Sequence, residues 1–325
     1  MVDGDAALEA LRGQITAAML GAPTYDRAAI AASAGISTDF ATRLWRAMGF
    51  ADVEDAAVVF TERDAAALAG AVTLHRSGIV DEEGIVAMTR AMAQSLSRLA
   101  VAQNDLVVAR LQQVAVGPEQ WVSAGAALAE ELLGVVSDIH DYIWRRHLAA
   151  VAESTLAASV GAVGEDLAVG FADLEGFTAL SRRLEPDELA ALVDRFESHA
   201  VQVIGDNGGR LVKTLGDEVM FAVPSASAGA EIALALAERA GDDDPAVRAG
   251  LAFGPVTSRL GDVYGPTVNV ASRLTGIARP GTVLLDRGAA DALREQPGYE
   301  VTRLRRHAVR GYAALAPFRL RRAAG

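Results

Sequence analysis

The stretch Arg210–Val223, RLVKTLGDEVMFAV, predicts a β-hairpin around which the second half of the chain is organised. Two short apolar runs, 211–215 and 219–223, flank a Gly-Asp dipeptide that suits a tight two-residue turn. Lys213, on the first strand, is the only lysine, because the other 29 of the 30 Lys and Arg residues are arginine. This position therefore favours a compact ammonium over a planar guanidinium. The alternative is a solvated cation on an ordinary hairpin.

The order of elements around this hairpin predicts an α+β fold in the second half. An apolar strand is expected at Leu167–Leu174 and a helix from Pro186 to about Gly205. After the hairpin come a helix over about 226–240 and a strand at 246–253. This β-α-β-β-α-β order is the split βαβ, ferredoxin-like plan. A further helix at about 267–278 and several short strands complete the chain.

Two carboxylates are expected to meet at one edge of this sheet. Asp173 ends the first strand and Asp217 lies in the hairpin turn, and the split βαβ plan makes these strands neighbours. Such a pair suits Mg²⁺ or Mn²⁺ held jointly with substrate phosphates. Gly176, Phe177 and Thr178 follow at a glycine turn and helix start, whose backbone N–H groups can bind a polyphosphate. Either aspartate alone could be a plain turn residue.

The stretch GDVYGPTVNVASRL, 261–274, supplies polar groups of a different kind. Pro266 is placed to begin a helix, and Asn269 and Arg273 fall four residues apart on one face of it. An amide and a guanidinium so aligned can bind a ribose and a phosphate under substitution. Asp262 precedes the turn and can accept a hydrogen bond from an exocyclic amine. For Arg273 the alternative is a surface salt bridge.

Composition limits the classes of protein to which the chain can belong. The 325 residues suffice for two domains, and the net charge of −12 argues against a protein that mainly coats nucleic acid. There is no cysteine, which excludes disulfides and thiolate metal sites. We find no apolar run long enough to span a bilayer and no signal-peptide pattern. The expectation is a cytoplasmic protein without stable membrane insertion.

The first half reads as almost entirely helical and alanine-rich. Within it, Tyr25–Phe50 predicts a helix, a turn at 34–36, a cap at Ser37 or Thr38 and a second helix ending near Gly49. This helix-turn-helix outline could enter a DNA groove. The second helix offers only two arginines in acidic surroundings, however, so ordinary helix packing is favoured over DNA binding.

Long helical character over Val122–Ala158 leads into the second half. His140 and His147 lie seven residues apart, so they share a helix face and form a candidate pH switch. The alternative is a solvated face with two incidental histidines. The segment 161–165 interrupts the helical pattern, which predicts a helical domain at 1–160 and a second domain at 161–325.

Three ordered motifs together resemble the class III nucleotidyl cyclase catalytic domain. They are FADLEGFT at Phe171–Thr178, KTLGDEV at Lys213–Val219 and DVYGPTVNVASR at Asp262–Arg273, and the resemblance covers about 164–321.

The resemblance implies a role for each motif residue. Asp173 and Asp217 would hold two divalent cations, Mg²⁺ or Mn²⁺. Lys213 and Asp262 would recognise adenine, which favours ATP over GTP, while Asn269 and Arg273 would orient the ribose and stabilise the transition state. Arg310 lies where the family often has a basic residue near pyrophosphate.

The implied protein is an adenylate cyclase that converts ATP into 3′,5′-cyclic AMP and pyrophosphate. Because this family builds its sites between two catalytic domains and one chain here holds all six residues, a homodimer with shared sites is expected.

The first half resembles the helical regulatory domain that precedes cyclase domains in some actinobacterial adenylate cyclases. The resemblance carries over an autoinhibitory, pH-responsive role and a fatty acid as a candidate ligand.

Two other readings remain open from the sequence. A diguanylate-cyclase-like enzyme shares the fold and an acidic hairpin, but its motif differs from the GDEV found at 216–219. The other reading is an inactive nucleotide-sensing regulator whose helical domain binds DNA or a partner.

Overall fold

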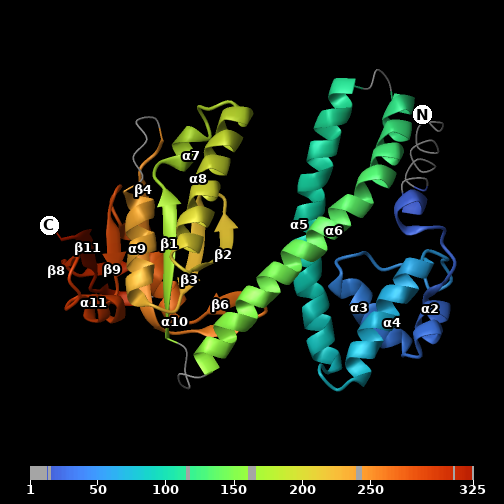
Figure 1. The fold of residues 1–325 in the computed structure, drawn as a ribbon, viewed down its shortest axis with the longest axis horizontal. Helices are drawn as coiled ribbons and strands as arrows, with labels where there is room; N and C mark the ends of the chain where they lie inside the picture. Colours follow the sequence, from blue (N-terminus) through green and yellow to red (C-terminus); the bar gives the residue numbers. More distant parts are fainter. Residues whose placement is uncertain are drawn as a thin grey trace. The chain divides into compact units, whose positions relative to one another are not determined.

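The computed structural model describes residues 13, 16–114, 118–159, 166–238, 244–309 and 312–323. The chain divides into two compact units, 1–153 and 154–325 (Figure 1). The segment 161–165, where the sequence predicts the domain boundary, lies outside the described residues.

The first unit is helical. Its elements are α2 (Arg27–Ala34), α3 (Thr38–Ala47), α4 (Glu62–Arg76), α5 (Glu82–Val114) and α6 (Pro118–Ser159), of which α6 continues into the second unit. Ser37 caps α3 by accepting a hydrogen bond from the Phe40 backbone N–H, and Gly35 ends α2 in the left-handed conformation. Phe40 and Leu44 of α3 pack against Ile85 and Val86 of α5 in a small core.

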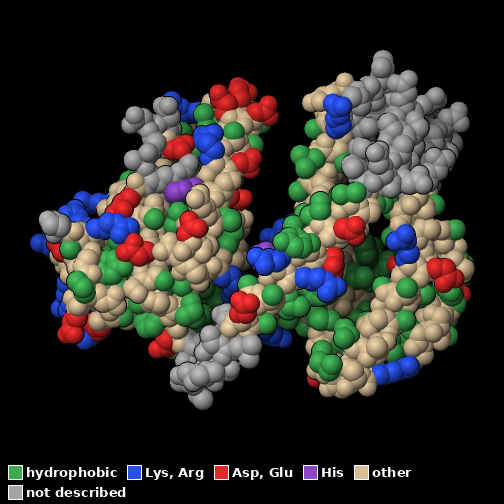
Figure 2. Space-filling model, viewed as in Figure 1, with side chains coloured by type: hydrophobic (Ala, Val, Ile, Leu, Met, Phe, Trp, Pro, Cys, Tyr) green, Lys and Arg blue, Asp and Glu red, His purple; other side chains and the backbone are tan. Residues whose placement is uncertain are grey.

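The two long helices, α5 and α6, carry much exposed apolar surface (Figure 2). On α6, Tyr142 is 63% exposed and Trp144 is 59% exposed. Even so, none of the described helices combines the length and apolar character needed to cross a membrane.

The second unit is a seven-stranded sheet covered by helices on both faces, with two small hairpins. Its first half contains β1 (Asp166–Leu174), α7 (Phe177–Leu180), α8 (Pro186–Asp206), β2 (Arg210–Leu215), β3 (Glu218–Val223), α9 (Ala226–Ala237) and β4 (Val247–Pro255). Its second half contains β5 (Thr257–Arg259), β6 (Asp262–Tyr264), α10 (Pro266–Ile277), β7 (Val283–Leu285), α11 (Arg287–Leu293), β8 (Tyr299–Arg303), β9 (His307–Val309), β10 (Tyr312–Leu315) and β11 (Phe318–Arg322).

The strand order of the main sheet is β2-β3-β1-β4-β7-β11-β8, and its first four strands pair antiparallel. This arrangement confirms the predicted split βαβ plan. The hairpin of β2 and β3 also forms as expected, because Gly216 adopts a φ of 71° in the two-residue turn.

The sheet has two different faces. One packs against α8, α9 and α11 around a large core that includes Phe196, Phe221 and Leu251. The other packs against α10 around a smaller core that includes Val169, Met220 and Val263. Side chains alternate between the two faces along each strand, so the strand register determines which polar residues lie together on the second face.

Helix α10 lies directly on the backbone of β4 at Gly250. A Cβ atom at this glycine would meet the Thr275 backbone nitrogen at 2.4 Å and the Ala271 carbonyl oxygen at 2.5 Å. The Thr275 hydroxyl also donates to the Phe171 carbonyl oxygen of β1 at 3.3 Å. The position of α10 on the sheet therefore depends on residue 250 being a glycine, which has no side chain.

We expect Gly250→Ala to lower the stability of the second unit by about 1–3 kcal/mol, because overpacking must push α10 away from β4. The measurement is thermal unfolding followed by circular dichroism. Gly276→Ala is the matched control on α10, where a Cβ meets nothing within 4 Å. Unfolding of both variants at the wild-type temperature would contradict this close packing.

Candidate active site

A row of three charged side chains crosses the central strands on the α10 face of the sheet. Asp173 on β1 lies opposite Glu218 on β3 and opposite Arg248 on β4. The Arg248 Nε donates to the Asp173 Oδ2 at 2.7 Å, and the Arg248 guanidinium also lies 3.5 Å from Glu175. The pairing of three strands thus places Asp173 between Glu218 and Arg248 at the strand ends.

Asp217 joins this row from the hairpin turn. Its carbonyl oxygen accepts a hydrogen bond from the Leu174 backbone N–H at 3.1 Å, which ties the turn to the end of β1. Burial raises the pKa of Asp173 and the Asp217 carboxylate raises it further, while Arg248 opposes the shift without cancelling it. The end of β1, which carries Asp173, and the turn that carries Asp217 are therefore neighbours.

Two oxygen-donating carboxylates that repel each other provide a suitable site for a divalent cation. Across the described ranges, no group of three or more histidine, aspartate or glutamate side chains is arranged to hold a metal ion. Asp173 and Asp217 are the carboxylate pair at this edge of the sheet that could hold a divalent cation.

Glu218 and Arg248 are the two members of this cluster that the sequence reasoning missed. Burial, followed by the charges of Asp173 and Asp217, raises the pKa of Glu218 to about 7. Both residues lie directly opposite Asp173, so an alignment of β1 with its two neighbouring strands identifies them. That register was not available from the sequence pattern alone.

Lys213 and Asp262, predicted to act together, form an ion pair between β2 and β6. The Lys213 Nζ donates to the Asp262 Oδ2 at 2.6 Å, and both side chains are partly buried. The Val263 backbone N–H donates to the other carboxylate oxygen at 2.8 Å. The two residues are 49 positions apart in the sequence, so the tertiary fold, and not local structure, brings them together.

A β-bulge puts the lysine on the correct face. Leu211 lies opposite Phe221 and Lys213 lies opposite Met220, so Val212 is an extra residue in the ladder. Leu211 packs in the larger core, whereas Val212 packs in the smaller core beneath α10. Strict alternation would have turned Lys213 toward the larger core, away from Asp262.

Asn269 and Arg273 both lie exposed on the outer face of α10, one turn apart. The inner face of the helix is buried through Thr267, Ala271 and Leu274. Within the described part of the chain, neither the Asn269 nor the Arg273 side chain has a hydrogen-bond or ion-pair partner. Both polar groups are therefore available to a ligand or to another chain.

The predicted phosphate-binding turn follows β1. Gly176 has a φ of 71° and begins α7, which contains Phe177 and Thr178 and has no side-chain cap. Arg310, the remaining predicted phosphate ligand, lies outside the described residues.

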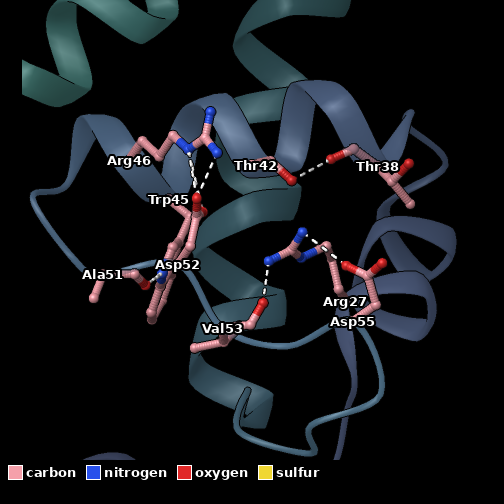
Figure 3. A network of polar contacts seen from close by, with 9 residues as sticks. All are labelled: Arg27, Thr38, Thr42, Trp45, Arg46, Ala51, Asp52, Val53 and Asp55. Atoms are coloured by element: carbon pink, nitrogen blue, oxygen red, sulfur yellow. Dashed lines mark hydrogen bonds and ion pairs between the residues drawn. The ribbon is translucent and has the colours of Figure 1, made fainter.

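In the first unit, acidic residues neutralise the arginines of the second helix of the helix-turn-helix outline. Arg43 pairs with Glu82 and Glu83 at the start of α5. Arg46 pairs with Asp52 in the loop that follows α3 (Figure 3). The two cations that could have met DNA phosphates are thus paired within the domain instead.

The same loop is fastened at other points (Figure 3). The Trp45 indole donates to the Ala51 carbonyl oxygen at 2.7 Å, and Arg27 pairs with Asp55 at 2.8 Å. These contacts identify the loop as part of the helical packing.

The two histidines of the predicted pH switch differ in environment. The His140 Nε2 lies 2.9 Å from the Gln103 side chain, which joins α6 to α5. His147 is exposed and lies about two helical turns further along α6. The structure therefore gives His140 a contact between helices and leaves His147 at the surface.

Comparison with known proteins assigns families to both units. Residues 162–321 match the family described as the adenylate and guanylate cyclase catalytic domain, and residues 14–148 match the adenylate cyclase regulatory domain.

Several curated proteins are similar over most of the chain. An adenylate cyclase of Glutamicibacter nicotianae is 39% identical over 315 residues, covering 91% of this chain and 78% of that protein. An adenylate cyclase of Streptomyces coelicolor is 43% identical over 277 residues, covering 83% and 72%. A pH-sensitive adenylate cyclase of Mycobacterium tuberculosis is 31% identical over 273 residues, covering 81% and 68%.

Among solved structures, the adenylyl cyclase CyaB from P. aeruginosa is similar to this chain, with 21% sequence identity and a TM-score of 0.44. The match covers 49% of this chain and 95% of the CyaB chain.

We expect Glu218→Gln to stabilise the metal-free protein increasingly as pH rises. The raised pKa means that the folded protein binds the Glu218 proton more tightly than the unfolded chain does. As pH rises from the ordinary glutamate pKa to about 7, the wild type therefore loses part of its stability. The glutamine variant does not lose it, because its side-chain amide cannot ionise.

The test is thermal unfolding in EDTA at pH 5 and at pH 8. The variant should match the wild type at pH 5 and unfold a few degrees higher at pH 8. Glu295→Gln, at an exposed position in the same unit, serves as the control. An equal difference at both pH values would rule out the shifted titration.

Proposed function

The chain belongs to the class III adenylate cyclases that carry a helical regulatory domain, and we propose that two copies of it together form the sites that convert ATP into 3′,5′-cyclic AMP. The observation that carries the proposal is the Lys213–Asp262 ion pair of 2.6 Å. An ammonium donor beside a carboxylate acceptor matches the ring nitrogen and the exocyclic amine of adenine. Guanine presents an oxygen where adenine presents that amine, so the pair favours ATP.

The reaction joins the ribose 3′-oxygen to the α-phosphorus and breaks the bond to pyrophosphate. Asn269 would hold the ribose, and Arg273 would stabilise the negative charge that develops on the phosphoryl oxygens. The N–H groups of Gly176, Phe177 and Thr178 would support the terminal phosphates. Arg310 is a further candidate for that role.

This family depends on divalent metal ions, and Asp173 with Asp217 would bind them here. We propose two cations, Mg²⁺ or Mn²⁺, between this carboxylate pair and the substrate phosphates. Bound there, the metal supplies Lewis acidity that lowers the pKa of the 3′-hydroxyl and neutralises phosphate charge. Arg248 keeps Asp173 oriented through its hydrogen bond of 2.7 Å.

We propose a homodimer in which one chain supplies Asp173 and Asp217 and the partner supplies the other four residues. The exposed, unpartnered state of Asn269 and Arg273 among the described residues supports this arrangement. Each dimer would then hold two equivalent sites.

A mixing experiment tests the shared site. Asp173→Ala and Asn269→Ala should each abolish cyclic AMP production, because each removes one half of both sites in a homodimer. Mixed and allowed to exchange subunits, the two variants should regain up to a quarter of wild-type activity, since a mixed dimer has one intact site and about half the dimers are mixed.

The control is a mixture of two chains that both carry Asp173→Ala, which should stay inactive. Subunit exchange is followed separately with differently tagged chains. Exchange without recovered activity would refute the shared site.

The other two readings are disfavoured. A diguanylate cyclase would leave Asn269 and Arg273 without a role, and a DNA-binding regulator would need the arginines that pair with Asp52, Glu82 and Glu83.

We further propose that the helical domain inhibits the enzyme in a pH-dependent way. The His140–Gln103 contact between α6 and α5 supports this, because histidine changes charge between about pH 5 and 8. A fatty acid as ligand of the helical domain stays a prediction.

Replacing His140 and His147 together by alanine should flatten the activity profile of the full chain between pH 5 and 8, because no charge then changes on this face of α6. Cyclic AMP formation is measured across that range. His307→Ala, at an exposed position in the catalytic domain, is the control. A profile identical to the wild type would remove these two residues from the switch.

A further inference from the structure

Glu175 carries a further carboxylate just past the end of β1, on the same side as Asp173. Leu174, between them, is 1% exposed and packs in the larger core, so its two neighbours face the other way. The Glu175 backbone N–H donates to the Ala246 carbonyl oxygen at 2.8 Å, which continues the pairing of β1 with the start of β4. The Glu175 side chain is therefore carried by a fixed backbone beside Arg248.

The guanidinium of Arg248 holds its two acidic neighbours unequally. Its Nε donates to the Asp173 Oδ2 at 2.7 Å, whereas its Nη1 lies 3.5 Å from the Glu175 Oε2. Among the residues that the structure describes, nothing donates a hydrogen bond to that buried glutamate oxygen. A separation of 3.5 Å is longer than an ordinary hydrogen bond between charged groups. The contact with Asp173 is thus firm, and the contact with Glu175 is loose.

The loose contact makes the Glu175 carboxylate easy to displace. A buried carboxylate oxygen without a hydrogen bond is unfavourable, because it has lost its water and gained no donor. The side chain as a whole is 41% exposed, so the carboxylate has a route into solvent. An anion that accepts a shorter hydrogen bond from the Arg248 Nη1 would therefore replace it.

Phosphate is the anion that the neighbouring residues favour. Asp173 is proposed to hold the metal ion that accompanies the substrate phosphates, and Arg248 is hydrogen-bonded to that same carboxylate. A phosphate group bound there would lie beside the guanidinium, which binds phosphate oxygens as well as carboxylate oxygens. Glu175 and the phosphate would then compete for one donor.

We propose that Glu175 is a positioning residue that acts as a tethered anion: its carboxylate occupies the Arg248 Nη1 in the free enzyme and is displaced by a phosphate group of the nucleotide or of pyrophosphate. This inference rests on the proposed function and assigns Glu175 a part in setting the affinity for phosphate. Binding of the substrate displaces the carboxylate, and departure of pyrophosphate lets it return. Glu175 acts through Arg248 and contacts no reacting atom.

Glu175→Gln tests the proposal, because it keeps the shape of the side chain and removes its charge. The dissociation constant of inorganic pyrophosphate should fall about 3–10-fold in the variant, as expected when one competing charge is removed beside a partly exposed cation. Calorimetric titration into the full chain with Mg²⁺ measures it. The KM for ATP should fall by a similar factor, and thermal unfolding checks that the variant is folded.

The direction of the change separates this role from a structural one. A glutamate that only holds Arg248 in place would, once neutralised, leave pyrophosphate binding weaker. A weaker or an unchanged affinity in Glu175→Gln would therefore overturn the proposal. Absence of pyrophosphate binding in both proteins would overturn it as well.

Two further variants make the comparison specific. Asp291→Asn removes the same charge from a carboxylate that lies 3.4 Å from Arg287 on α11, the helix on the other face of the sheet, and should leave the affinity unchanged. In a chain that also carries Arg248→Gln, Glu175→Gln should change the affinity by no more than about twofold, because its partner is gone. The full effect without Arg248 would contradict an action through that residue.

Pyrophosphate binding is measured without turnover, so the two proposals can fail separately. A protein that binds pyrophosphate more tightly after Glu175→Gln but makes no cyclic AMP would refute the proposed function and leave the role of Glu175 standing. Normal cyclic AMP production, with a pyrophosphate affinity that does not rise in the variant, would do the reverse.

Discussion

The antiparallel pairing of β1 with β3 on one side and β4 on the other is the constraint on which the rest of the site depends. It aligns Glu218, Asp173 and Arg248 across three strands on one face of the sheet. The Arg248 guanidinium partly offsets the repulsion between the carboxylates in this row. Burial nevertheless keeps the pKa values of Asp173 and Glu218 raised. Such a site is preorganised for positive charge before any ligand arrives.

On the second face of the sheet, the residues proposed for base recognition and those proposed for phosphate chemistry lie on different elements. Lys213 and Asp262 lie on β2 and β6, while Asn269 and Arg273 lie on α10, which rests on β4 through Gly250. Each group is carried by a rigid element rather than a loop, so its geometry depends on packing in the small core. In the regulatory half, the arginines of α3 pair with acidic residues of the same half.

Much of this arrangement could be predicted from the sequence. The hairpin, the split βαβ order and the helix beginning at Pro266 follow from turn chemistry and short-range patterns, and the three motifs identified the family. What could not be predicted depended on register. Arg248 and Glu218 look ordinary until β1 is aligned with its neighbours, and the bulge at Val212 leaves no mark in the pattern of apolar residues.

The bulge in β2 makes the direction of the Lys213 side chain depend on an irregular strand register. With Val212 inserted, the lone ammonium group projects toward Asp262, and the strand before it keeps its place in the larger core. If the ladder closed without the bulge while Val212 stayed in the chain, Val212 would lie opposite Met220, and Lys213 would lie opposite Val219 and face the larger core. Loss of Val212 itself would leave Lys213 opposite Met220. A deletion at this point of the strand can therefore be silent at Lys213, whereas in an uninterrupted strand it would reverse every side chain beyond it.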